Sequence, residues 1–352
     1  MKPNQILETI HRALDSAGLG QQAGNSGNVR DVIDRALKGA GLDRWSAPSQ
    51  GSTDASCVTF DASEGQAFRD LLHSSEHGTR QYKLFVPSSY DGSPRPLIVM
   101  LHGCKQNPED FAAGTQMNLL AQTHGILVAY PAQTPRANGG NCWNWFESSQ
   151  QVRGGSEPSL IAGIVSDIGR DYALDQRKTF VAGLSAGAAM AVILGHTYPE
   201  VFSAVAAHSG LPIGAAHDVA SAFAAMHGQV AASPFGIGAR APTRTIVFHG
   251  DADATVAPGN GHAITAQAIA AFKRHGTSLR RVERRDASAG TRPSTCTEYV
   301  DDLGLVQVEE CVVRGGGHAW FGGNPKGSYT DPTGPDASRE MVRFFLQDFP
   351  SS

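Results

Sequence analysis

A serine between two glycines is the first candidate for chemistry. Residues 183–187 read GLSAG, with Ser185 at the centre of the pattern G-x-S-x-G. The apolar run 179–182 precedes this pattern and the alanine-rich stretch 186–198 follows it, which predicts a sharp turn from a strand into a helix. Such a turn presents the serine hydroxyl as a nucleophile, and the free N–H groups at the start of the helix can stabilise a negatively charged oxygen.

The side chains that could activate this serine lie further along the chain. Asp251 and Asp253 follow the apolar run 245–248, and His318 follows three consecutive glycines after the run 306–313. A serine nucleophile needs a base, and the base needs a carboxylate that orients it. We therefore expect His318 to be the base and one of the two aspartates to orient it.

Three other histidines also follow expected strands. His102 and His249 each precede the glycine of a turn, and His208 comes before the acid in the sequence. The chain has 13 histidines, so position has to decide between them. We expect His102 and His249 to brace their loops, and His208 to have a structural or pocket-lining role.

Ester chemistry also needs a second N–H donor for the developing oxyanion. The apolar run 97–101 leads into a loop that contains Cys104, where an early strand-to-helix connection would supply this donor. We expect the N–H groups of Cys104 and Ala186 to form the oxyanion hole. The sequence contains neither an HExxH nor a CxxC pattern, so we predict no metal ion and no other cofactor.

The pattern of apolar runs predicts the elements that position these residues. Strands are expected at 82–86, 97–101, 126–130, 179–182, 205–207, 245–248 and 306–313. Helices are expected between them at 111–123, 160–172, 186–198, 262–275 and 337–347. Strands that are apolar along their whole length and alternate with helices favour an α/β fold with a mostly parallel central sheet covered by helices on both faces. Ligands bind such sheets at the carboxyl ends of the strands, where the candidate residues lie.

The chain divides into three parts by composition. Residues 1–46 contain the pattern I-x-R-A-L-x-x-A-G-L twice, which predicts a small helical extension of two short helices. Residues 47–78 are rich in Ser, Gly and Asp and are expected to be a linker, and residues 79–352 form the expected catalytic domain.

Four motifs, in order along the chain, resemble the poly(3-hydroxybutyrate) depolymerase-type esterases. They are 101–106 (LHGCKQ), 141–146 (NCWNWF), 182–187 (AGLSAG) and 317–320 (GHAW). This family has the α/β-hydrolase fold, and feruloyl and acetylxylan esterases share much of its framework. The resemblance implies a fold of this kind over most of the chain.

The resemblance also implies roles for individual residues. Ser185, His318 and Asp253 would form a catalytic triad, because Asp253 fits the family's H-G-x-x-D-x-x-V motif better than Asp251 does. Cys104 and Ala186 would form the oxyanion hole. The implied activity is that of a serine carboxylic ester hydrolase on poly(3-hydroxybutyrate) or on short-chain hydroxyalkanoate polymers or oligomers.

Two alternatives to this function stay open. One is an esterase for feruloyl or acetylxylan-type carbohydrate esters. The other is a non-catalytic binding protein that retains the fold. Trp143 and Trp320 lie near the candidate site in the sequence, and we expect both to line the substrate pocket because aromatic walls suit an uncharged acyl chain.

Composition limits the partners. The net charge of −4 and the absence of a basic stripe argue against nucleic acid as a partner. The sequence contains no run of 18 apolar residues, so no membrane-spanning helix is predicted. The expected partner is the ester substrate alone, and the sequence leaves the oligomeric state open.

The five cysteines bear on both structure and localisation. We predict the bridges Cys104–Cys142, near the site, and Cys296–Cys311, which leaves Cys57 unpaired. The polar N-terminus, without the apolar stretch of a secretory signal, favours the cytoplasm, whereas two disulfides would suit a secreted protein.

Overall fold

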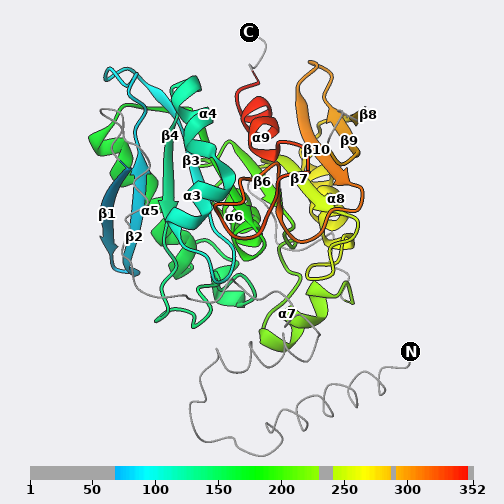
Figure 1. Ribbon diagram of the computed structural model, residues 1–352, viewed down its shortest axis with the longest axis horizontal. Helices are drawn as coiled ribbons and strands as arrows, with labels where there is room; N and C mark the ends of the chain where they lie inside the picture. Colours follow the sequence, from blue (N-terminus) through cyan, green and yellow to red (C-terminus); the bar gives the residue numbers. More distant parts are fainter. Residues whose placement is uncertain (1–67, 230–240, 287–290, 348–352) are drawn as a thin grey trace, which may run out of the picture. The chain divides into compact units, whose positions relative to one another are not determined.

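The computed structural model describes residues 68–229, 241–286 and 291–347 (Figure 1). The expected N-terminal helices at 1–46 and Cys57 lie outside these residues. Within them the chain forms a ten-stranded sheet and a separate two-stranded sheet of β11 (Trp320–Phe321) and β12 (Thr330–Asp331). In spatial order the large sheet contains β1 (Phe68–Ser75), β2 (Gly78–Phe85), β4 (Leu127–Pro131), β3 (Arg95–Leu101), β5 (Leu174–Leu184), β6 (Ala204–His208), β7 (Arg244–Gly250), β10 (Val306–Val313), β9 (Ser294–Val300) and β8 (Arg280–Asp286).

The six central strands, from β4 to β10, run parallel, whereas β1, β2, β9 and β8 pair antiparallel at the two sides. The register aligns the carboxyl ends of the parallel strands. Leu101 pairs with Gly183, Leu184 with His208, and His208 with Phe248. The loops that follow these strands therefore start at the same edge of the sheet.

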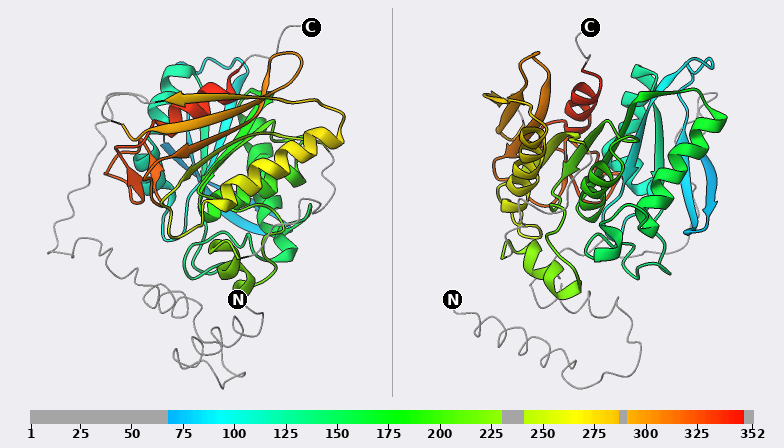
Figure 2. Two further views of the ribbon diagram at one scale, coloured as in Figure 1. Left: turned by 90° about the vertical axis from the view of Figure 1, so that its right-hand side faces the viewer. Right: turned by 180° about the vertical axis from the view of Figure 1, so that it is seen from behind.

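Helices cover both faces of the sheet. The described helices are α3 (Pro108–Thr115), α4 (Met117–His124), α5 (Ser156–Asp171), α6 (Ala186–Thr197), α7 (Val219–Met226), α8 (Gly259–Arg274) and α9 (Ala337–Phe345), with a short 3-10 turn at Ser148–Gln150. Helices α5 and α6 pack on one face of the sheet, against Leu97, Val99 and other alternate strand residues. Helices α3, α4 and α9 pack on the opposite face, against Ile98 and Met100 (Figure 2). Because successive strand residues point to opposite faces, a strand that is apolar throughout serves both cores, and the expected fold class is confirmed.

The boundary expected between linker and catalytic domain is wrong. β1 lies inside the segment 47–78 that composition assigned to the linker, and it pairs with β2 over its whole length. The sequence of β1 is mostly polar, and most of its side chains are exposed at the side of the sheet. A strand with so little buried surface shows no apolar run, so its composition resembles that of a linker.

The expected helix 111–123 is also two helices rather than one. Gln116 separates α3 from α4 with a φ of 53°, in the left-handed region that ends a helix.

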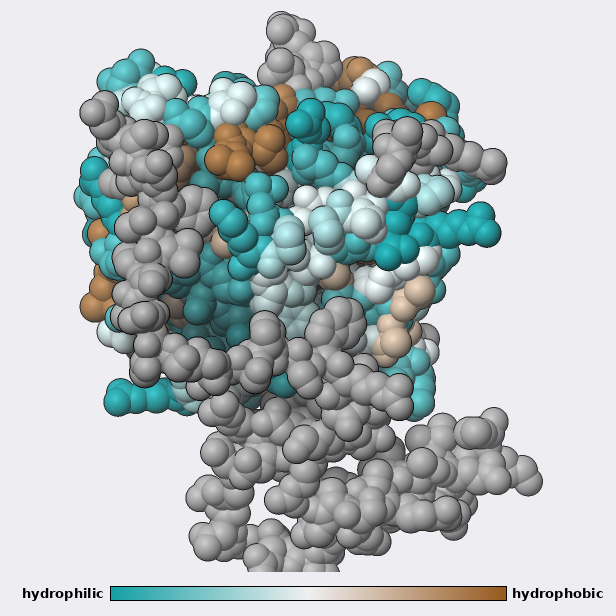
Figure 3. Space-filling view, in the orientation of Figure 1, coloured by the Kyte–Doolittle hydropathy of each residue, from teal (hydrophilic) through white to brown (hydrophobic). Residues whose placement is uncertain are grey.

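The surface of the α3, α4 and α9 face is mostly hydrophilic where Figure 3 colours it, and its hydrophobic side chains lie in small separate groups. No helix in the described ranges combines the length and the hydrophobicity that crossing a membrane requires.

Candidate active site

Ser185 stands at the turn between β5 and α6 with an unusual backbone. Its φ is 57° and its ψ is −118°, a region that residues other than glycine rarely adopt. Such a conformation costs on the order of 1–3 kcal/mol and persists only where the surroundings impose it. The side chain is partly exposed, as a nucleophile requires.

The two glycines of the G-x-S-x-G pattern allow this turn because neighbouring backbone atoms lie where a Cβ atom would be. A Cβ atom on Gly183 would lie 2.4 Å from the carbonyl carbon of Gly187. A Cβ atom on Gly187 would lie 2.1 Å from the carbonyl oxygen of Leu101 at the end of β3. The second contact brings the start of α6 directly against the loop that carries Cys104, so the two candidate N–H donors come from touching segments.

His318 and Asp253 meet at this edge of the sheet. The Nδ1–H group of His318 donates to Oδ2 of Asp253 at 2.8 Å. A carboxylate can only accept, so the proton of a neutral His318 lies on Nδ1 and the basic lone pair lies on Nε2. This is the protonation pattern that a general base for a serine hydroxyl needs.

Asp253 is held as a carboxylate. Burial alone would raise its pKa, but hydrogen bonds from His249 and His318 and a backbone N–H group outweigh burial and hold the pKa well below its ordinary value. Its Oδ1 accepts from the N–H groups of Thr255 and Val256 at 2.9 and 2.8 Å. The side chain is fully buried, so it offers His318 a fixed negative charge.

Asp251, the other candidate acid, has a different contact. Its Oδ1 accepts from the N–H group of Gly315 at 2.6 Å, and the N–H group of Ala252 donates to the carbonyl oxygen of Gly316. A Cβ atom on Gly250 would lie 2.1 Å from that same oxygen. Asp251 therefore ties the loop after β7 to the glycine loop that carries His318.

The loop with Cys104 is fixed by a covalent bridge and by a buried glutamine. The predicted disulfide Cys104–Cys142 is confirmed, as is Cys296–Cys311 between β9 and β10. Gln106 accepts from the N–H group of Gly103 at 2.9 Å and donates to the carbonyl oxygen of Ser328 at 3.1 Å. It thus connects the expected oxyanion loop to the segment between β11 and β12.

A buried polar network supports the other side of this loop, and the sequence analysis missed it. Glu157, at the start of α5, accepts from the N–H and side-chain amide groups of Asn144 at 2.8 Å each. Gln133 donates to Glu157 and to the carbonyl oxygen of Cys142. Burial raises the pKa of Glu157, although its hydrogen bonds and the charge of Arg80 oppose this. Single polar residues in separate segments give no pattern that would have revealed the network.

The three other histidines have structural contacts. His102 donates from Nδ1 to the carbonyl oxygen of Gly103 and accepts at Nε2 from the N–H group of Gln133, which confirms that it braces its loop. His249 donates from Nε2 to the carbonyl oxygen of Val256, seven residues on, and likewise braces its loop.

His208 is fully buried and serves two segments of the site. Its carbonyl oxygen accepts from the N–H group of Ser185 at 2.9 Å, and its Nε2 accepts from the N–H group of Phe321 at 3.1 Å. Burial, followed by the nearby His249 and His318, lowers its pKa well below the ordinary value, so it stays neutral. Of the two roles expected for it, the structural one fits.

The two tryptophans do not have the placement expected for pocket lining. Trp143 is 0% exposed and donates to the carbonyl oxygen of His102. Trp320 is 1% exposed, stacks on His208 with ring centres 5.1 Å apart and donates to Oγ of Ser338. Both indoles are core residues whose polar N–H groups are already satisfied, and their proximity to the site in sequence was misleading.

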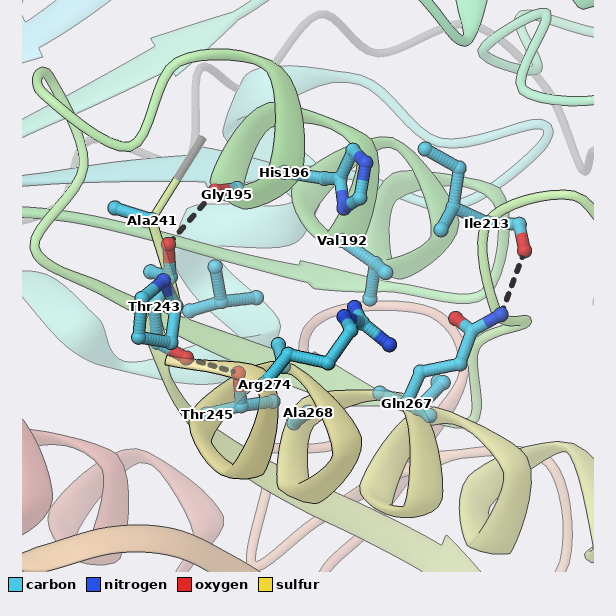
Figure 4. A pocket seen from close by; sticks show the side chains of 14 residues that line it. Val192, Gly195, His196, Ile213, Ala241, Thr243, Thr245, Gln267, Ala268 and Arg274 are labelled. Carbon is cyan, nitrogen blue, oxygen red and sulfur yellow. Dashed lines mark hydrogen bonds between the residues drawn. The ribbon is translucent and has the colours of Figure 1, made fainter. Parts of the chain in front are cut away.

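A cavity elsewhere in the described residues is not the candidate site. It lies between α6 and α8 and is lined by residues that include Val192, His196, Ile264 and Gln267 (Figure 4). None of the expected triad or oxyanion residues lines it.

Comparison with known proteins decides the family. The model of the esterase PHB depolymerase family matches residues 80–288, more than half of the chain. The chain belongs to this family. Among PHB depolymerase family relatives, poly(3-hydroxyalkanoate) depolymerase C of Paucimonas lemoignei is 34% identical over 193 residues, which cover 52% of this chain and 46% of that protein. A probable acetylxylan esterase A of Aspergillus fumigatus is 30% identical over 203 residues, which cover 53% of each chain. The chain thus spans about half the length of these curated relatives.

Solved structures agree on the fold of this PHB depolymerase family member. The acetyl xylan esterase of Aspergillus awamori superposes with a TM-score of 0.58 at 20% sequence identity, covering 79% of this chain and 98% of that one. At this identity the likeness establishes the α/β-hydrolase-type fold alone.

Proposed function

We propose that this protein is a serine esterase that hydrolyses hydroxyalkanoate esters through an acyl-enzyme on Ser185. The hydrogen bond between His318 and Asp253 is the observation that carries the proposal. A buried carboxylate lies behind the imidazole, and Ser185 follows β5 at the same edge of the sheet in a strained turn, which supports a serine hydrolase mechanism. Membership of the PHB depolymerase family supports the same chemistry.

In the proposed mechanism each residue has one task. Ser185 attacks the ester carbonyl while Nε2 of His318 takes its proton, and Asp253 stabilises the imidazolium that results. The N–H groups of Cys104 and Ala186 receive the oxyanion; that of Ala186 lies at the start of α6, where no intrahelical acceptor is available. The alcohol leaves with the proton from His318, and water then releases the acid by the same steps.

The substrate class follows from the relatives. The similarity to poly(3-hydroxyalkanoate) depolymerase C of Paucimonas lemoignei, which is 34% identical to this chain, supports hydroxyalkanoate polymers or oligomers as the substrate. A second candidate is acetylated xylan, because the probable acetylxylan esterase of Aspergillus fumigatus is also 30% identical. The two disulfides suit an oxidising compartment, so we propose that the enzyme works outside the reducing cytosol.

The test compares substrates on the purified protein. We expect 3-hydroxybutyrate oligomers to be hydrolysed with a higher kcat/KM than acetylated xylo-oligomers or feruloyl sugars. The opposite order would favour the carbohydrate esterase. A fluorophosphonate probe should label Ser185, and a folded protein that neither binds the probe nor hydrolyses any of these esters would be a binding protein instead.

A pair of serine variants assigns the nucleophile. Ser185→Ala should lower kcat by at least about a thousandfold and abolish labelling, because no other group can form the acyl-enzyme. Ser166→Ala, on the outer side of α5, is the matched control and should leave both unchanged. Parent-like activity of the Ser185→Ala variant would refute the assignment.

A further inference from the structure

Asp253 has two imidazole neighbours rather than one. Its Oδ2 accepts from Nδ1 of His318 at 2.8 Å and lies 3.4 Å from Nε2 of His249. His249 is next to the last residue of β7 and is 1% exposed. The proposed mechanism gives no role to this second, buried imidazole.

The contacts of His249 fix where its proton lies. Nε2 is 2.9 Å from the carbonyl oxygen of Val256, which can only accept, so Nε2 must carry a hydrogen. Oδ2 of Asp253 lies 3.4 Å from the same nitrogen, beside this hydrogen bond. The other ring nitrogen, Nδ1, is buried and has no hydrogen-bond partner among the described residues. It faces Gly261 in α8, where an added Cβ atom would lie only 2.8 Å away. The ring is therefore held in one orientation, with its N–H group on the carbonyl oxygen of Val256 and close to the carboxylate of Asp253.

We propose that His249 is a positioning residue for the machinery proposed above: its Nε2–H group, which donates to Val256, lies beside the carboxylate that His318 contacts and so limits how strongly Asp253 holds a proton on His318. The inference rests on the proposed function. A carboxylate that receives more N–H groups is a weaker base, since each donor stabilises its charge. The pKa of Asp253 is lowered, and the nearby His249 is one of the causes, which supports the inference.

The consequence is that the enzyme should stay active to a lower pH. A strongly basic Asp253 would stabilise the imidazolium form of His318, and the imidazolium cannot act as a base. The other titratable groups on the neighbouring elements are the same in the parent and in the His249 variants: His208 on β6 is buried and neutral, Asp251 accepts from Gly315, and His262 on α8 pairs with Glu310 on β10.

Three variants test this role through the pH dependence. His249→Leu removes the donor, and we expect the acid-side apparent pKa of kcat/KM to rise by about half a unit, a roughly threefold loss of rate on the acid side. His249→Gln keeps an N–H donor at about the reach of Nε2 and should return the apparent pKa to that of the parent. His262→Leu, whose imidazole is exposed and pairs with Glu310, is the matched control and should not shift it.

The rate of labelling by a fluorophosphonate, followed over the same pH range, gives a second readout that does not depend on the ester. A folded His249→Leu variant with the parent's acid limit in both assays would overturn the inference. If this variant does not fold, His249→Asn replaces it, because the shorter amide cannot reach Asp253. A parent protein that neither hydrolyses esters nor reacts with the probe would overturn the proposed function as well, whereas an active parent with an unmoved acid limit overturns this inference alone.

Discussion

The main-chain N–H group of Ser185 donates a 2.9 Å hydrogen bond to the carbonyl oxygen of His208 on the neighbouring strand β6. The imidazole of the same histidine accepts from the N–H group of Phe321, three residues after His318. One buried residue thus connects the turn of the proposed nucleophile with the segment that follows the proposed base.

Replacing this residue should loosen both segments. His208→Leu leaves the buried N–H group of Phe321 without an acceptor, and we expect the free energy of unfolding to fall by about 1–3 kcal/mol, with a lower kcat. Denaturant unfolding and steady-state kinetics measure the two effects. His217→Leu, at an exposed position, is the control and should change neither. Equal effects of the two substitutions would contradict this assignment.

The two disulfides should affect different properties. In the chain-entropy model, opening the 15-residue loop of Cys296–Cys311 costs about 3 kcal/mol of stability, and opening the 38-residue loop of Cys104–Cys142 costs about 4 kcal/mol. Only the second bridge holds the expected oxyanion loop. We therefore expect the Cys104→Ser, Cys142→Ser double variant to have a strongly lowered kcat, even at temperatures where it is still folded. The Cys296→Ser, Cys311→Ser double variant should have a kcat near that of the parent. A similar kcat for both double variants would show that the bridge does not position the oxyanion donors.

Gly187 and Gly169 offer a matched pair of helical glycines. A methyl group on Gly187 would lie 2.1 Å from the carbonyl oxygen of Leu101, whereas one on Gly169 in α5 would have its nearest neighbour, a side-chain atom of Leu174, at 3.6 Å. Gly187→Ala should therefore cost more than about 3 kcal/mol of stability or displace the Ser185 turn. Gly169→Ala should stabilise the protein by about 0.5–1 kcal/mol, because alanine is the better helix former. Thermal unfolding distinguishes them, and comparable stability of both variants would refute the close packing at Gly187.

Acid should destabilise the protein through His102. Burial lowers the pKa of His102 from 6.5 to about 4, so the unfolded chain binds a proton on this residue at a pH where the folded protein does not. Above pH 6.5, His102 is neutral in both states and the free energy of unfolding has its full value. This free energy decreases as the pH falls from 6.5 toward 4, because only the unfolded chain gains the proton. His102→Gln should make the free energy of unfolding less dependent on pH in this window, by up to about 3 kcal/mol. Unfolding curves at pH 7, 5.5 and 4 measure the slope, and an unchanged slope would mean that another group causes the acid sensitivity.

The sequence predicted the interior of the fold better than its borders. β3 and β10 are apolar over most of their length because helices cover them on both sides, and the expected strands matched them closely. β1 and β8 lie at the two ends of the sheet and are rich in polar residues, so hydrophobicity did not reveal them. A strand at an end of a sheet obtains its order from backbone pairing with one neighbour, which leaves little trace in its composition.

The same distinction applies to the site. The order of Ser185, Asp253 and His318 along parallel strands was enough to predict that Asp253 and His318 meet, because these strands end at one edge. The hydrogen bond from Gln106 to Ser328 and the approach of His249 to Asp253 were not predictable. They depend on where particular side chains point, and in the first pair the partners are 222 positions apart.

The place of β10 in the sheet has a consequence for biosynthesis. This strand pairs with β7 on one side and β9 on the other. The glycine loop that follows it carries His318 at the edge of the sheet where β3, β5 and β7, which come earlier in the chain, also end. The segment with the turn around Ser185 is therefore synthesised long before the proposed base, His318. If the proposed function holds, translation products that stop short of β10 would carry the serine without its base, and we expect ester hydrolysis to require synthesis of the chain at least through His318.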